Sequence, residues 1–172
     1  FVPIENDMEL LMDITQYDSV QDRRKDADNH FDNEDYARAR TYYLQLNDRQ
    51  NATISRGYLY LQDGKFLEGI KTLYPFEAHQ KVAFDYTTEK EMRPFRIFLG
   101  FKSGRLTLKA IHEMLGDDSI ISLIRPYSEE TIYAQLLDDA LSLMNAIYEF
   151  RILRTIKQKE EGDTYGKDRT II

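Results

Sequence analysis

The 172-residue sequence contains no cysteine. It can therefore form no disulfide framework and no metal site built on thiolate ligands. It has no run of about 18 apolar residues, so we expect no membrane-spanning helix. No signal or transit peptide is visible, and the lack of cysteine fits the cytoplasm or the nucleus. Because the chain begins at Phe1 rather than at methionine, we expect a fragment or a processed form of a longer protein.

Sequence motifs for catalysis are absent too. There is no GxSxG motif, no phosphate-binding glycine loop and no cysteine nucleophile. The HExxH zinc motif fails, because Gly116 stands where the second histidine after His112 and Glu113 would be. Asp117 and Asp118 are better explained as a helix cap than as a metal-binding pair. We therefore predict no catalytic, cofactor-binding or metal-binding residues.

The balance of charge argues against polyanionic partners. The formal net charge is −7, and a surface of that sign repels phosphate, so we expect no contact with nucleic acid or anionic membranes. The polar stretch 20–30 predicts an exposed helix or a connector. Asp26, Asp28 and His30 within it are interpreted as a polar turn rather than as cation ligands. With 42% apolar and 31% charged residues, the composition is that of an ordinary globular chain.

The stretch from Ile54 to Phe76 is the clearest structural signal. Its two halves each place apolar residues three and four apart, which is one face of a helix, and Asp63-Gly64 separates them. Helices joined so closely must fold back on each other. Gly57 and Gly69 allow the two backbones to approach closely, so we predict a helical hairpin on which the other helices stack.

Helical patterns dominate the rest of the chain, and strand patterns are scarce. We predict an all-α fold, an irregular α-solenoid or helical bundle of about eight to ten short helices. Residues 1–157 are expected to form one helical domain, and residues 158–172, which lack an apolar period, a polar and mobile tail. Asp138 and Asp139 leave open whether the last helical region is one helix or two. Expected helices fall near residues 4–19, 33–46, 89–101, 105–115, 119–125 and 128–157.

The hairpin also has features of a tetratricopeptide unit. Gly57, Tyr60, Gly64 and Gly69 lie near that family's spacing of small and aromatic residues. The pattern does not recur 34 residues further on, where Glu91, Pro94, Phe98 and Ser103 stand. A regular tetratricopeptide array is therefore not expected.

Over most of residues 1–155 the chain resembles the helical domain of the ELYS family of nuclear pore assembly proteins. An opening amphipathic helix is followed by YYLQL at 42–46 and GYLYLQDGKFLEGIKTL at 57–73, which is similar to the family's aromatic-rich helix, acidic-glycine turn and following helix. LTLKAIHEML at 106–115 is similar to its next helix. SEETIYAQLLDDALSLMNAIYEFRILR at 128–154 is similar to its closing helical pair.

The resemblance implies a non-enzymatic scaffold of the nuclear pore, located in the nucleus. Its partners would be outer-ring nucleoporins of the Y-shaped complex, including β-propeller or α-solenoid subunits, with no small-molecule substrate. The alternative is a tetratricopeptide-like adaptor that binds a protein or peptide outside the pore. An enzyme ranks third, because it would need a polar site assembled from distant residues.

Partner binding is expected at the last helical region, which is apolar on two adjacent faces. Tyr148, Phe150, Ile152 and Leu153 are the candidate partner-binding residues, because they extend past the domain's own core. The competing interpretation is that all four are core residues. The tail from Gln158 could instead be a linear motif that orders on binding.

Overall fold

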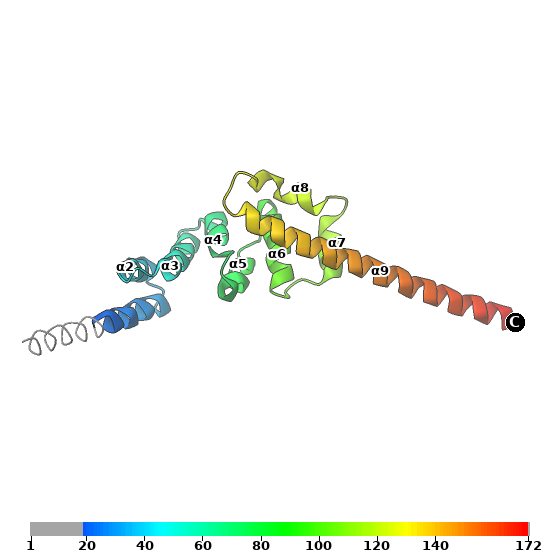
Figure 1. Cartoon of the computed structure of the whole chain (residues 1–172), viewed down its shortest axis with the longest axis horizontal. Coiled ribbons are helices and arrows are strands. Elements are labelled where there is room, and N and C mark those ends of the chain that lie inside the picture. The colour runs from blue at the N-terminus through cyan, green and yellow to red at the C-terminus, as the bar shows by residue number, and fades with distance from the viewer. Residues whose placement is uncertain (1–18, 172) are drawn as a thin grey trace, which may run out of the picture. The chain divides into compact units, whose positions relative to one another are not determined.

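Every regular element that the structure describes is a helix, as predicted. The structure, a computed structural model, describes residues 19–171, and the side chains of residues 19–162 (Figure 1). The contacts divide the chain into two compact units, Phe1–His79 and Gln80–Ile172. The helix expected near residues 4–19 lies almost wholly outside the described residues.

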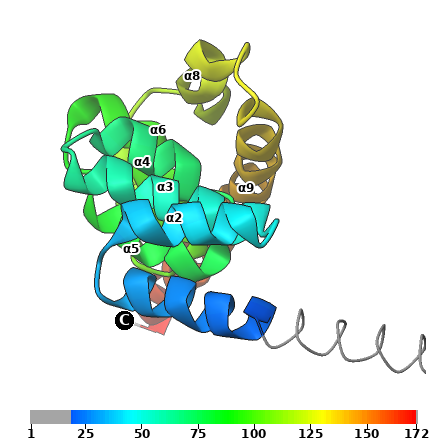
Figure 2. The same ribbon diagram turned by 90° about the vertical axis from the view of Figure 1, so that its left-hand side faces the viewer.

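The first unit is a succession of antiparallel helices. A helix over residues 19–32 is followed by α2 (Tyr36–Gln45), α3 (Arg49–Gln62), α4 (Phe66–Leu73) and the short 3₁₀ helix η1 (Glu77–His79). Helix α3 packs on both α2 and α4 (Figure 2). The predicted central hairpin is thus α3 and α4.

The turns before α2 and before α4 share one hydrogen-bond pattern, 30 residues apart. The amide of Asp35 donates to the His30 carbonyl at 2.8 Å, and the amide of Lys65 donates to the Tyr60 carbonyl at 2.9 Å. The residues before them, Glu34 and Gly64, have φ angles of 63° and 76°. This left-handed residue with its reciprocal bonds is a Schellman ending of the preceding helix. Two hairpins, residues 19–45 and 49–73, therefore repeat with a period of 30.

Small residues occupy equivalent places in the two hairpins. Ala27 and Ala39 are fully buried in the first. Gly57 and Gly69 stand 30 residues further on, and a Cβ added to Gly69 would lie 3.0 Å from the Gly57 carbonyl oxygen. The predicted close approach of the two backbones is confirmed. The repeat lies upstream of the central hairpin at a period of 30, whereas the sequence comparison searched downstream at 34.

The second unit packs shorter helices around the first half of α9. These are α5 (Gln80–Asp85), η2 (Lys90–Met92), α6 (Arg93–Lys102), α7 (Leu108–Leu115), α8 (Ile120–Ile124) and η3 (Arg125–Tyr127). Helix α9 (Tyr133–Ile171) contacts α6, α7 and α8. The fully buried side chains of the unit include Phe95, Phe98, Ile111, Ile124, Leu136 and Leu143.

Helix α9 differs from two expectations. It is one helix of 39 residues, without the break considered at Asp138 and Asp139, and it continues through the expected tail. Adding a residue to an existing helix is far easier than starting one, so residues 158–171 need no apolar period to remain helical. Residue 157 therefore ends no helix, and the contacts place the only division between compact units at His79 and Gln80. Mobility of the tail stays a prediction.

The predicted cap at Asp117 and Asp118 is wrong. Ser119 caps α8, its side chain accepting a hydrogen bond from the Ser122 amide at 3.2 Å. Asp118 instead pairs with Arg93, with 2.5 Å between Oδ2 and Nη2. The serine hydroxyl reaches the third amide of the helix because Ser119 is extended, with φ −83° and ψ 149°.

Candidate protein-binding surface on helix α9

One face of α9 is buried in the second unit. Leu136, Ala140, Leu143 and Ile147 follow each other at spacings of three and four, and each is at most 5% exposed. Lys102 at the end of α6 pairs with Asp139, with 3.1 Å between Nζ and Oδ2. These contacts fix which way the other faces of α9 point.

A second row of apolar side chains runs along α9 and is exposed. It starts beside the buried face and continues past the other helices, where the ribbon of α9 stands alone (Figure 1). Spacings of three and four keep these residues on one side of the helix. We call it the α9 stripe, and its members are Leu141 at 49% exposure, Met144 at 40%, Tyr148 at 66%, Ile152 at 41% and Ile156 at 49%.

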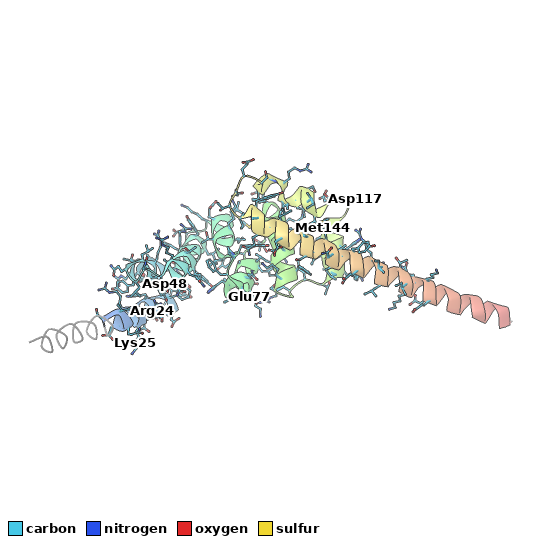
Figure 3. All side chains as sticks on the ribbon, in the orientation of Figure 1. Arg24, Lys25, Asp48, Glu77, Asp117 and Met144 are labelled. Atoms are coloured by element: carbon cyan, nitrogen blue, oxygen red, sulfur yellow. The ribbon has the colours of Figure 1, made fainter. Side chains whose placement is uncertain are left out.

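The stripe borders a groove of about 410 Å³ within the second unit. Met144, labelled in Figure 3, and Tyr148 form the α9 side of this groove. Leu115 at the end of α7 and Ile120 at the start of α8 form the opposite side. The floor and walls are therefore mainly apolar. The remaining lining residues are Asp118, Ser119, Asn145, Ile147 and Arg151.

A basic segment follows on the same helix. Residues 150–159 contain Arg151, Arg154, Lys157 and Lys159 and no acidic residue, although the whole chain carries a net charge of −7. All four side chains are exposed. Arg151 reaches back to α7, where its Nη2 lies 3.3 Å from His112 Nε2. The exposed half of α9 thus combines apolar and cationic side chains.

The four candidate residues from the sequence do not share one environment. Tyr148 and Ile152 belong to the α9 stripe, while Leu153, 66% exposed, lies on a different side of the helix. Phe150 is half-buried. The competing interpretation, that all four are core, does not fit these exposures. Partner binding itself stays a prediction.

Sequence reasoning missed Leu141, Met144 and Ile156. The first two were read as widening the buried stripe, because their spacing from Tyr148 fits a helix face equally well in either case. Only the position of the core face, set by Leu136 and Leu143, shows that they point away from it. Continuing the spacing of four from Tyr148 through Ile152 would have found Ile156.

The histidines and acidic residues form no evident site. His30 lies near Asp35, His79 bonds to Tyr58 and His112 contacts Arg151. Within the part of the chain that the structure describes, no three His, Asp or Glu side chains could together hold a metal ion. Among the same residues, no helix is long and apolar enough to cross a membrane.

Comparisons with protein-family models, curated proteins and solved structures found no significant match. The geometry of the α9 stripe and its groove is therefore the basis for a functional proposal.

Proposed function

We propose that this chain is a non-enzymatic helical scaffold that binds a partner protein through α9. The α9 stripe is the observation that carries the proposal. Five exposed apolar side chains in one row exceed the scattered exposure that is normal on a protein surface. A helix that lays its apolar face along such a row and into the adjoining groove would remove both from water.

The basic segment indicates the chemistry of the partner. Four cations without an intervening acid favour an acidic surface opposite them. The partner is therefore an amphipathic helix with acidic residues flanking its apolar face. Charge of this kind sets orientation and association rate, while the apolar row supplies most of the affinity.

The resemblance to the ELYS family supports a more specific proposal. It makes the chain a nuclear pore scaffold at the nuclear envelope, with outer-ring nucleoporins of the Y-shaped complex as partners and with a role in pore assembly. Those complexes are built from β-propellers and α-solenoids, and a long helix that leaves its own core is a suitable element for joining an α-solenoid subunit.

The test is affinity purification of the full-length protein from cells. Co-isolation of outer-ring nucleoporins and enrichment at the nuclear rim support the proposal. The double variant Tyr148→Ser, Ile152→Ser should lose them, while Val20→Ser, a comparably exposed apolar residue at 45% in the first unit, should retain them. Retention of the nucleoporins by the α9 variant would reject α9 as the binding surface.

The repeated hairpins favour a second candidate, a tetratricopeptide-like adaptor outside the pore. Two hairpins with the same turns and small-residue contacts are the beginning of a helical repeat array. Recovery of unrelated client proteins in the same purification, without staining at the nuclear rim, would favour the adaptor over the pore scaffold.

A further inference from the structure

A small groove lies between α2 and α3 in the first unit, away from α9 in the sequence. Its volume is about 220 Å³. Helix α3 contributes four residues spaced as one helix face, and α2 contributes two residues one turn apart. We call it the arginine groove, and its lining residues are Arg40, Leu44, Arg49, Ala52, Thr53 and Arg56.

The three arginines of this groove have no acidic partner among the described residues. All three are exposed. Nearby arginines differ: Arg24 pairs with Asp48, and Arg38, two residues before Arg40 on α2, lies 3.6 Å from Asp35. A chain with 30 acidic residues has enough carboxylates to pair these cations as well. Three like charges beside one groove repel each other until an anion joins them.

The chemistry of the groove matches a phosphate group beside an apolar residue. Guanidinium groups bind phosphate and carboxylate through paired hydrogen bonds, and phosphate carries about two negative charges and three acceptor oxygens. Leu44, 50% exposed, and the buried Ala52 supply the apolar contact. The net charge of −7 disfavours a long polyanion such as nucleic acid, whereas a single dianionic side chain meets only the local positive field.

We propose that the arginine groove binds a phosphorylated serine or threonine of a partner peptide that carries an apolar residue close by. Arg40, Arg49 and Arg56 hold the phosphate, and Leu44 contacts the apolar residue. The site would make binding by the first unit depend on phosphorylation of its partner, independently of any contact made by α9.

The test uses the full chain immobilised and two pools of random peptides. One pool has phosphoserine at its central position, and the other has serine there. Retention is measured at low and high salt for the wild-type chain, for Arg40→Gln, Arg49→Gln and Arg56→Gln, and for the matched control Arg38→Gln on the same helix. Peptides recovered from the phosphoserine pool are then made singly, with phosphoserine, glutamate or serine, for affinity measurement.

We expect the phosphopeptides to bind roughly tenfold tighter than their serine versions, with glutamate in between. Each groove variant should lose about fivefold to tenfold in affinity, and Arg38→Gln should match the wild type. Equal retention of the two pools would overturn the proposal, as would equal losses in Arg38→Gln and the groove variants. Competition by a single-stranded oligonucleotide as strong as that by the phosphopeptide would also overturn it, because any polyanion would then suffice.

Discussion

The two hairpins of the first unit share a backbone but differ in the side chains that hold them. In residues 19–45 the buried small residues are alanines, and polar groups join the helices: the Tyr43 hydroxyl donates to the Asp28 carboxylate. In residues 49–73 the small residues are glycines, packed against buried Leu61 and Leu73. The turn and a small residue on each helix are what the two hairpins have in common, so these features set the geometry and the other contacts are interchangeable.

The polar contacts of the first hairpin also extend to the start of the second. Arg24 Nη1 lies 2.9 Å from Asp48 Oδ2, and the two side chains are labelled in Figure 3. Burial alone would raise the pKa of Asp48, but hydrogen bonds from Arg24 and Asn51 outweigh it and lower that pKa. Burial and the bond to Asp28 raise the pKa of Tyr43. Ion pairing thus supports a position where the second hairpin uses apolar packing.

The largest effect should come from adding a methyl group at the glycine contact. In Gly69→Ala the new Cβ would lie 2.6 Å from Leu61 Cδ2 and 3.0 Å from the Gly57 carbonyl oxygen, so the helices must separate. We expect a loss of about 2 kcal/mol in the free energy of unfolding, measured by urea denaturation.

Two variants serve as controls for this contact. Gly162→Ala meets no atom within 4 Å and should stabilise α9 by at most about 1 kcal/mol. Ala39→Gly, at the equivalent place in the first hairpin, should cost about 1 kcal/mol through helix propensity alone. If Gly69→Ala were as stable as the wild type, close approach would not define the second hairpin.

The next effect concerns Asp48, which caps α3 and pairs with Arg24. Its Oδ1 accepts a hydrogen bond from the Asn51 amide at 3.1 Å. Asp48→Ala removes the cap and the ion pair and should cost about 1 to 2 kcal/mol in urea denaturation. Asp48→Asn keeps the cap and loses only the charge, so it should cost less. Equal losses would show that the ion pair, and not the cap, carries the stability.

Local features of the first unit could be predicted from the sequence, because the chemistry of neighbouring residues decides them. Asp63-Gly64 predicts a helix end, since glycine adopts the φ of 76° without strain. The equivalent ending at Glu34 gave no such signal, because glutamate rarely adopts a left-handed conformation. The 30-residue repeat was hidden for the same reason: the two hairpins share backbone geometry but few residue types.

The binding surfaces were less predictable, because they depend on tertiary packing. The apolar residues of α9 form two adjacent faces in the sequence, and nothing local tells which one is covered. The contacts of α9 with α6, α7 and α8 decide it and leave Met144 and Tyr148 exposed. Likewise Arg40 and Arg56 are 16 positions apart in the sequence, and only the packing of α2 on α3 brings them to one groove.

A smaller effect separates the hairpins by pH. Phe31 from the first hairpin and Tyr58 from the second pack edge to face, with ring centroids 5.4 Å apart, and His79 joins them. Tyr58 Oη lies 2.6 Å from His79 Nδ1, which accepts the hydroxyl proton when the ring is neutral. Burial lowers the pKa of His79 below its ordinary 6.5.

The sign follows from where the proton binds. The unfolded chain takes up the His79 proton at higher pH than the folded chain does, so the contribution is complete above about 6.5 and is lost as the pH falls below that value. The Asp48 contribution, in contrast, is lost only as the pH falls through the lowered pKa of that carboxyl group. Denaturation midpoints between pH 7.5 and 5 should decline less in His79→Asn than in the wild type, and parallel declines would contradict this assignment.

The smallest effect should come from Glu34, where the two turns differ most in residue type. Glu34 has φ 63° at the place that Gly64 fills in the second hairpin. A left-handed conformation costs a residue with a Cβ roughly 1 to 2 kcal/mol, of which glycine's greater freedom in the unfolded chain cancels a part. Glu34→Gly should therefore stabilise the first unit by about 0.5 kcal/mol, seen as a higher urea midpoint at unchanged slope. Gly64→Ala should destabilise it, although a Cβ there would meet nothing within 4 Å, so a neutral Gly64→Ala would show that backbone strain does not distinguish the turns.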